Sequence, residues 1–405
     1  MIEARLRTVV IGGLVSAVAV ACTAGPPLHG SAPSPEASAI AGGAAAAARR
    51  DAHPLFVVAH EDDDVLFMNP DLGDDIRAGL PVETVYLTAG DAGKDTEYWM
   101  EREAGIRAAY AFMAGIPDAW TESRPVIAGK RLVRFTAKGR PDLQVTFVRL
   151  PDGNGDGSGY DVTGHASLIK LWNGEIAEMR ALDGDGGAAT RFGRADLVAV
   201  LGAILEEHRA DHLHTLDSSE LYALTVYDDH PDHVVSARLA FEASLGYRAP
   251  HRLSMYRAYN TSNEPVNLSP EQSVTKREIY KRYDAHYECR GAPDLDACLG
   301  KWDAFPGPYG SWMQRMYVLR SRDAQVSAAG AVWATTPAGE LRAGDQCLEA
   351  AGGAVRGAAC NGGRAQQWRV IENGQIRGVG GCLAAGPTVT VAACNGSAGQ
   401  TWPLR

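Results

Sequence analysis

Two short segments far apart in the chain carry the side chains best suited to chemistry. Residues 59–64 read Ala-His-Glu-Asp-Asp-Asp, so that one histidine is followed by four consecutive carboxylates, and residues 230–233 read His-Pro-Asp-His. Neighbouring carboxylates repel one another strongly unless a cation is bound. Histidine nitrogens and aspartate oxygens are ligands that zinc accepts. The two segments together therefore predict a zinc site, although either one alone is also typical of a solvated acidic loop or of a helix start capped by Asp232.

The two segments resemble the paired motifs of the PIG-L/LmbE family of zinc-dependent N-deacetylases, which are Ala-His-Pro-Asp-Asp-Glu and His-Pro-Asp-His. The resemblance extends over residues 54–322. In this chain Glu61 stands where the family has Pro, and Asp64 stands where it has Glu. Since these two positions flank the key residues, we expect the metal site to be retained and the shape of the loop and its substrate contacts to differ.

The resemblance implies a set of metal ligands. His60, Asp63 and His233 would bind Zn²⁺ and leave the fourth position open for water, which is the arrangement of a catalytic zinc site. Zinc lowers the pKa of such a water towards about 7, so that hydroxide is available at neutral pH.

The same resemblance implies the acid and base of an amide hydrolysis. Asp62 would be the general base that takes the proton of the attacking water, while the metal stabilises the oxyanion. His230 would be the general acid, protonating the leaving amine as an imidazolium, and Asp232 would hold its ring in the required orientation. Without that proton the amide nitrogen leaves poorly.

Other candidate residues rest on weaker signals. Arg102, on an expected helix, would shape the substrate pocket, with a surface ion pair as the alternative. Tyr227 precedes the second motif and would assist the oxyanion, and His286 would border the substrate pocket. Residues 152–157 imitate the start of an EF-hand loop, but the twelfth position is Thr163 and not Glu, which favours a hairpin turn over a calcium site.

The elements around these motifs indicate an α/β fold. Short apolar runs at 55–59, 84–87 and 213–216 are typical of strands buried on both faces. Helical spacing predicts helices over 97–113, closed by Gly115, and over 234–244. We therefore expect a Rossmann-like layered domain with a mostly parallel sheet and its site at the carboxyl ends of the strands. The turn-rich stretch 126–187 is interpreted as an insertion on the sheet.

Residues 1–22 have the pattern of a secretory signal. Arg5 and Arg7 precede an apolar run over 9–21, which is too short to span a bilayer and ends in small residues. Cys22 directly after this run resembles a lipoprotein processing site and would carry a lipid anchor. The residue three positions before it is Ala where such sites usually carry Leu, so ordinary cleavage before the cysteine is the alternative. Either way we expect a secreted or cell-surface protein.

The rest of the chain divides into three parts. Residues 23–53 are rich in Ala, Pro, Ser and Gly and cannot bury a core, which predicts a flexible tether. Residues 54–322 form the expected catalytic domain, and residues 326–405 form a small module. Six cysteines outside the signal suggest disulfides between nearest neighbours, with a structural zinc site as the rival interpretation. The expected pairs are Cys289 with Cys298, Cys347 with Cys360, and Cys382 with Cys394.

The small module contains an internal repeat. A Cys-Asn-Gly sequence followed by Gln-x-Trp occurs twice at a period of 34 residues (394 − 360) and resembles the ricin-type β-trefoil lectins. The resemblance implies a partial, all-β trefoil-like fold, because only two copies are visible and a trefoil has three. The residues that close the copies are Gln366, Trp368, Gln400 and Trp402. The sugar-binding Asp of the family is replaced by Glu349 and Ala384, so a repeat that serves the fold alone is as well supported as a working lectin.

Composition narrows the range of partners. A net charge of −10 argues against nucleic acid or an anionic membrane surface as the main partner. We expect a secreted zinc hydrolase that removes an N-acetyl group from an N-acetylglucosamine-type sugar or glycoconjugate. Two alternatives remain: an extracellular N-acyl deacylase of a glycosylated natural product, and a cell-surface carbohydrate-binding protein with a vestigial hydrolase site.

Overall fold

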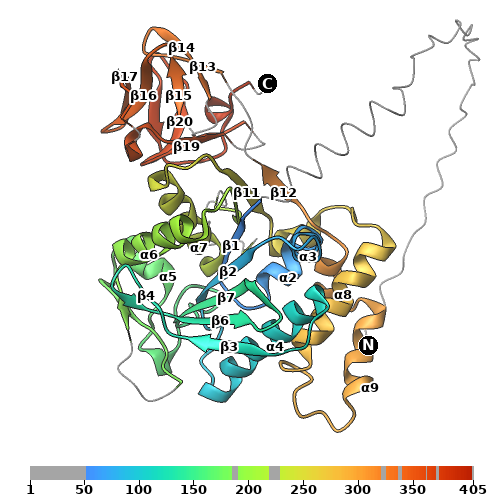
Figure 1. Cartoon of the computed structure of the whole chain (residues 1–405). Helices are drawn as coiled ribbons and strands as arrows, with labels where there is room; N and C mark the ends of the chain where they lie inside the picture. The colour runs from blue at the N-terminus through green and yellow to red at the C-terminus, as the bar shows by residue number, and fades with distance from the viewer. Residues whose placement is uncertain are drawn as a thin grey trace, which may run out of the picture. The chain divides into compact units, whose positions relative to one another are not determined.

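The computed structural model describes residues 52–184, 190–218, 229–320, 325–335, 340–361, 363–370 and 374–403. The predicted signal with Cys22, nearly all of the tether, and Tyr227 lie outside these residues. Figure 1 shows the course of the chain. Among the described helices, none combines the length and the apolar character needed to cross a bilayer.

An eight-stranded sheet forms the centre of the first domain. Strand β1 (Pro54–Val58) pairs in parallel with β10 (His212–Leu216) on one side and with β2 (Val82–Thr88) on the other. All five residues of β1 are buried, as expected for an apolar strand covered on both faces. The full strand order is β12-β11-β10-β1-β2-β7-β6-β3. The outer strands are β3 (Trp120–Ser123), β6 (Val133–Ala137), β7 (Arg140–Leu150), β11 (Arg252–Tyr256) and β12 (Val318–Arg320).

Helices cover both faces of this sheet (Figure 1). Alternate residues of β1 enter two separate cores: Phe56 and Val58 one, Leu55 and Val57 the other. The first core is closed by α2 (Asp63–Phe67), α3 (Asp71–Arg77), α4 (Thr96–Ala114), α8 (Pro270–Asp284) and α10 (Gly307–Met313). The second is closed by α5 (Leu168–Asn173), α6 (Arg194–His208) and α7 (Pro231–Gly246).

Short elements complete the domain. They are β4 (Val126–Ile127), β5 (Lys130–Arg131), η1 (Asp161–Thr163), β8 (Met179–Arg180), β9 (Arg191–Phe192), η2 (Tyr259–Asn263), α9 (Leu295–Gly300) and η3 (Lys301–Ala304).

The predicted fold class is confirmed, since four of the seven strand pairings of the sheet are parallel. The predicted strands and helices are present. Gly115 closes α4 in the left-handed conformation, with φ of 64°. One interpretation is wrong: the stretch 126–187 is not an insertion throughout, because β6 and β7 within it belong to the main sheet and β7 pairs in parallel with β2. The polar residues Gln144 and Thr146 interrupt the apolar run of β7 and conceal a buried strand.

The C-terminal module is a curled sheet of nine strands around a core that includes Trp333 and Trp368. This agrees with the predicted all-β, trefoil-like module. All three predicted disulfides are present: Cys289–Cys298, Cys347–Cys360 and Cys382–Cys394. The strands are β13 (Gln325–Ala328), β14 (Ala331–Thr335), β15 (Leu341–Ala343), β16 (Gln346–Ala351), β17 (Ala354–Ala359), β18 (Trp368–Val370), β19 (Ile376–Gly378), β20 (Gly381–Ala384) and β21 (Thr390–Ala392), with short helical turns η4 (Arg364–Gln366) and η5 (Ala398–Gln400).

Candidate metal centre and active site

The two sequence motifs meet at the carboxyl end of the central strands. His60 lies in the bend directly after β1, and Asp63 is the first residue of α2. His233 lies in the first turn of α7, the helix that follows β10 in the chain. Since β1 and β10 are parallel neighbours, their carboxyl ends lie at the same edge of the sheet, which brings the histidines together.

Three ligand-type atoms converge at this edge. His60 Nδ1 lies 3.1 Å from His233 Nε2, Asp63 Oδ1 lies 2.9 Å from His233 Nε2, and Asp63 Oδ1 lies 3.5 Å from His60 Nδ1. Nitrogen and oxygen ligands placed tetrahedrally around zinc at about 2.0–2.1 Å would be about 3.3 Å apart. All three residues are buried. The geometry and chemistry of this donor set therefore fit a tetrahedral metal site with one position left for another ligand.

The electrostatics of the cluster also favour a cation. Burial lowers the pKa of His233, but the carboxylates of Asp63 and Asp229 outweigh burial and raise that pKa to about 9. Burial likewise opposes ionisation of Asp63, yet His233 and His60 hold the pKa of its carboxyl well below the usual range. The surroundings thus stabilise positive charge at the point where the three ligand atoms face one another.

A second layer of contacts fixes the ligands. Asp229 Oδ1 lies 2.6 Å from His233 Nδ1, so the imidazole donates its proton there and keeps Nε2 free to bind a metal. Asp63 Oδ2 accepts the backbone N–H groups of Ala59 and His60, at 3.1 and 2.7 Å, which leaves Oδ1 for the metal. Asp229 was not among the predicted site residues, although a carboxylate four residues before a ligand histidine could have suggested it.

Asp62 is held by an arginine. Arg102 Nη2 donates to Asp62 Oδ1 at 2.9 Å, and its Nε donates to the Tyr283 hydroxyl at 2.6 Å and lies 3.4 Å from Glu61 Oε2. Burial raises the pKa of Asp62, and Arg102 opposes that rise. The same two effects act on Glu61, whose pKa is raised to about 8. Arg102 is therefore a buried partner of the site and not a surface ion pair.

Gly90 makes room for this arginine. The residue has φ of 50°, and a Cβ there would lie 2.3 Å from Arg102 Nη1 and 2.6 Å from Glu61 Oε2. Arg102 also donates to the Gly90 carbonyl. A side chain at this position would displace the guanidinium from Asp62.

His230 is the N-cap of α7, and its orientation is set by the backbone. Its Nδ1 accepts the backbone N–H of Asp232 at 3.1 Å, whereas the Asp232 carboxylate is 3.9 Å away. The proton of the neutral ring is therefore on Nε2, which lies 3.9 Å from Asp152 Oδ1. Burial, with His60 nearby, lowers the pKa of His230 to about 4.

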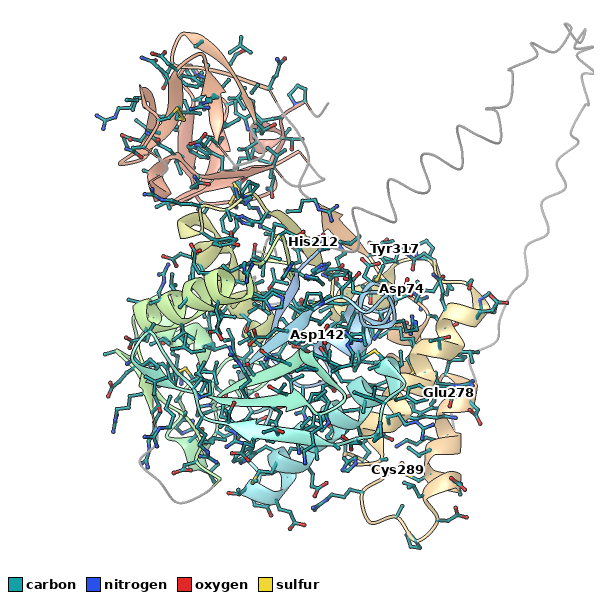
Figure 2. The ribbon with its side chains drawn as sticks, in the orientation of Figure 1. Asp74, Asp142, His212, Glu278, Cys289 and Tyr317 are labelled. Carbon is teal, nitrogen blue, oxygen red and sulfur yellow. A yellow bond between two sulfur atoms is a disulfide. The ribbon has the colours of Figure 1, made fainter. Side chains whose placement is uncertain are left out.

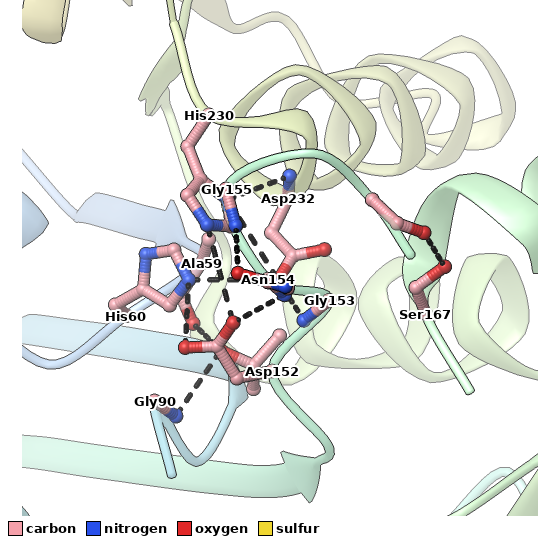
Figure 3. Close-up of polar contacts among 12 residues, drawn as sticks. Ala59, His60, Gly90, Asp152, Gly153, Asn154, Gly155, Ser167, His230 and Asp232 are labelled. Atoms are coloured by element: carbon pink, nitrogen blue, oxygen red, sulfur yellow. Dashed lines mark hydrogen bonds and ion pairs between the residues drawn. The ribbon is translucent and has the colours of Figure 1, made fainter. Parts of the chain in front are cut away.

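The carboxylates of Asp152 and Asp232 face the His60 ring (Figure 3). His60 Nε2 lies 3.5 Å from Asp232 Oδ2 and 3.9 Å from Asp152 Oδ2. Gly153 donates its N–H to Asp232 Oδ2 at 2.7 Å. The start of the loop that resembles an EF-hand is therefore part of this site, and the chain turns directly after it, where Gly157 donates its N–H to the Asn154 carbonyl at 2.9 Å.

Asp64 turns into the core and not towards the metal ligands. Its Oδ2 accepts hydrogen bonds from the hydroxyls of Tyr86, at 2.7 Å, and Tyr110. Burial raises the pKa of Asp64 to about 7, although these hydrogen bonds oppose the rise. The position at which this chain has Asp in place of the family's Glu therefore contacts core tyrosines and not the metal-site residues.

Comparison with known families agrees with this geometry. Residues 55–244 match the family described as PIG-L: GlcNAc-PI de-N-acetylase. The chain contains a PIG-L family domain. Residues 319–402 match the ricin-type beta-trefoil lectin domain, so both predicted resemblances are confirmed. The family match supports a hydrolytic de-N-acetylase. No curated protein matches the chain.

Solved structures similar to the chain are distant. N,N'-diacetylchitobiose deacetylase from Pyrococcus horikoshii is 14% identical over 63% of this chain and 76% of its own, with a TM-score of 0.36. A deacetylase of the teicoplanin biosynthesis pathway is 14% identical over 63% and 94%, with a TM-score of 0.34. The conserved protein TT1542 from Thermus thermophilus is 17% identical over 63% and 89%, with a TM-score of 0.32. Similarity this low says nothing about the activity of this chain.

One predicted substrate contact, His286, has no contact with the metal-site residues in the described structure, and a second is not tested by it. His286 Nδ1 lies 2.9 Å from Glu101 Oε2 of α4 and is about one-third exposed. The His286 side chain contacts α4, and among the described residues it makes no contact with His60, Asp63 or His233. Tyr227 lies outside the described residues.

The repeat glutamines of the lectin-like module make the same contacts in both copies. Gln366 Oε1 accepts the backbone N–H of Asn361 at 2.8 Å, and Gln400 Oε1 accepts that of Asn395 at 2.8 Å. In each copy Nε2 donates to the carbonyl seven residues earlier. Both glutamines are buried, so they brace the fold.

The repeat tryptophans behave in the same way. Trp368 Nε1 donates to the carbonyl of Leu348 at 2.8 Å, and Trp402 Nε1 donates to that of Leu383 at 3.1 Å. Each closes its copy onto the Cys-Leu strand that opens it. Sugar binding by the module stays a prediction.

Proposed function

We propose that the PIG-L domain is a zinc-dependent amidohydrolase that removes the N-acetyl group from an N-acetylglucosamine-type sugar or glycoconjugate outside the cell. The observation that carries this proposal is the convergence of His60 Nδ1, Asp63 Oδ1 and His233 Nε2 within 3.5 Å of one another. A bound zinc ion would supply a Lewis acid for the amide carbonyl and make a neighbouring water a better nucleophile.

Asp62 is the proposed general base. Its carboxylate belongs to the residue next to a metal ligand, and Arg102 holds one of its oxygens at 2.9 Å. The raised pKa of the Asp62 carboxyl strengthens it as a proton acceptor. In the proposed reaction Asp62 takes a proton from the attacking water, the C–N bond breaks, and the departing nitrogen must gain a proton.

The contacts of His230 bear on how that proton is delivered. The predicted role of general acid requires an imidazolium, whereas His230 Nδ1 accepts the N–H of Asp232. We therefore propose that Asp62 passes the proton of the water to the departing amine. His230 would donate a hydrogen bond from Nε2 to the carbonyl oxygen as it gains negative charge.

Extracellular action is proposed from the chain as a whole. Residues 1–22 have the pattern of a signal, and Cys22 would anchor the protein if it is lipidated. Three disulfides are typical of an oxidising compartment. We propose residues 54–322 as the deacetylase domain and 326–405 as a lectin-like module that binds carbohydrate.

Metal content and acetate release from the full chain test the function together. We expect about one zinc per chain, and acetate release from N-acetylglucosamine, its oligomers or its simple glycosides that a chelator abolishes and zinc restores. The double variant His60→Ala/His233→Ala should lose both zinc and activity. Activity in that double variant, or a chain that binds no zinc, would contradict the proposal.

A further inference from the structure

A continuous run of aromatic side chains lies beside the metal centre. We call it the aromatic arc. Neighbouring members have ring centroids between 4.7 and 5.9 Å apart, within the range of stacked and edge-to-face pairs. In order, the arc consists of Tyr259, Trp312, Tyr309, Tyr280, Tyr283, Tyr287 and Tyr98, with Trp302 packed behind Tyr280 and Tyr309.

The arc contacts residues of the site at two places. At one end the Tyr259 ring lies 4.9 Å from the ring of the metal ligand His233. Near the other end, the guanidinium of Arg102 lies 5.1 Å from the ring of Tyr287, the neighbour of the terminal Tyr98. Since Arg102 also donates to Asp62, the arc extends from a metal ligand to the partner of the proposed base.

The arc has a buried layer and an exposed layer. Tyr280, Tyr283, Trp302 and Trp312 are buried, with Tyr280 and Tyr283 fully so. The rings that remain partly open to solvent all belong to tyrosines, namely Tyr98, Tyr259, Tyr287 and Tyr309.

Most of the arc comes from a part of the chain beyond the family match. The match ends at residue 244, and every member except Tyr98 lies between residues 259 and 312. Figure 2 marks this region by Glu278 on α8 and by Cys289 of the disulfide with Cys298. Most of the arc therefore lies outside the residues that the family model matches.

Buried polar contacts make the region rigid. Asp284 Oδ2 accepts the Trp302 indole N–H at 2.7 Å. The ammonium of Lys276 on α8 is buried and donates to the carbonyls of Trp312, at 2.9 Å, and Arg315, at 2.7 Å. The rings are thus held in place before a ligand arrives, which lowers the entropic cost of binding.

We propose that the aromatic arc is a subsite for the additional sugar rings of an oligosaccharide whose N-acetylated ring lies at the metal centre. This inference rests on the proposed function and narrows its substrate to a chain of sugars. A pyranose ring has an apolar C–H face and a rim of hydroxyls, and a partly exposed tyrosine offers an apolar face and a hydroxyl in return. A fatty acyl chain would instead match a wall of exposed aliphatic side chains.

The test compares substrates of different length on the full chain. Wild type should have a higher kcat/KM for the tetramer of N-acetylglucosamine than for the monosaccharide. In Tyr287→Ala and Tyr309→Ala this ratio should fall about threefold to tenfold each, chiefly through KM for the tetramer. Tyr287→Phe and Tyr309→Phe should restore most of it, which separates lost stacking from misfolding. Tyr317→Ala, which removes a half-buried tyrosine outside the arc, should leave the ratio unchanged.

Two results would overturn the inference. One is that the alanine variants leave the ratio of kcat/KM for the tetramer to kcat/KM for the monosaccharide unchanged. The other is that the same variants lower kcat/KM for a long-chain N-acyl substrate as much as, or more than, kcat/KM for the tetramer. If no sugar releases acetate, the proposed function has failed and calorimetry of the tetramer still tests the arc. Weaker binding of the tetramer by Tyr287→Ala/Tyr309→Ala than by wild type would then support the subsite. Equal binding of the tetramer would mean that another part of the chain binds it and would overturn the inference.

Discussion

The affinity of the proposed metal centre should depend on the carboxylate hydrogen-bonded to His233. Asp229 Oδ1 lies 2.6 Å from His233 Nδ1 and fixes both the tautomer and the ring direction. Removing such a partner usually weakens metal affinity about 10- to 100-fold. Asp229→Ala should therefore lower zinc affinity by that factor, measured by competition with a chromophoric chelator. Asp74→Asn, which alters an exposed carboxylate labelled in Figure 2, is the control and should leave affinity unchanged.

His230 offers a second test at the residue scale, because two substitutions separate its two possible roles. Glutamine retains an N–H donor but cannot act as an acid. If His230 donates a hydrogen bond to the oxyanion, His230→Gln should keep kcat within about tenfold of wild type, while His230→Ala should lose about 10²- to 10³-fold. Equal losses of about 10²-fold or more in both variants would restore the general-acid role. Zinc content of each variant must match wild type for the comparison to hold.

At the scale of elements, the close contact between α4 and α8 depends on a glycine, which has no side chain to separate the two helices. A Cβ on Gly105 of α4 would lie 2.7 Å from the Tyr283 carbonyl, which is backbone and cannot rotate away. Gly105→Ala should therefore lower the free energy of unfolding by about 1–3 kcal/mol, measured in urea. Gly202→Ala in α6 is the matched control: no atom lies within 4 Å of its Cβ, so it should raise stability by up to about 1 kcal/mol through helix propensity. Similar changes in both variants would show that packing at Gly105 is not limiting.

The elements also show how far the sequence predicts this molecule. Continuous apolar runs were sufficient to predict β1, β2 and β10, because these strands are buried on both faces. Helical spacing of apolar residues was sufficient to predict α4 and α7. The proposed ligands His60, Asp63 and His233 were implied by the resemblance of the two motifs to the PIG-L/LmbE family, and the structure brings them together. Asp152 was not inferred, because it lies on a loop that carries no periodic signal. The aromatic arc was not inferred either, because its rings come from separate helices and loops that only tertiary packing brings together.

At the scale of the whole molecule, a buried histidine couples folding to pH. His208 Nε2 lies 3.0 Å from the Pro54 carbonyl at the start of β1, and burial lowers the pKa of His208 below its usual 6.5, although Glu83 opposes this. The unfolded chain then binds more protons than the folded one, so this part of the stability is complete above pH 6.5 and is lost as pH falls below it. The slope is at most about 1.4 kcal/mol per pH unit for one proton. His208→Gln should flatten the urea stability profile between about pH 7 and pH 5, and an unchanged slope would contradict the assignment.

The lectin-like module is so small that its two disulfides should contribute most of its stability. A core of fewer than about 80 residues contributes only a few kcal/mol on its own. The disulfide Cys382–Cys394 closes a loop with a sequence separation of 12. Such a cross-link lowers the entropy of the unfolded chain, which stabilises the folded module by about 3 kcal/mol. Cys382→Ser/Cys394→Ser should therefore unfold the module at a markedly lower temperature, followed by calorimetry of the full chain. Because the proposed metal ligands lie at the edge of a different sheet with its own two cores, zinc content should stay near wild type. A loss of zinc together with the module would mean that the two domains unfold as one cooperative unit.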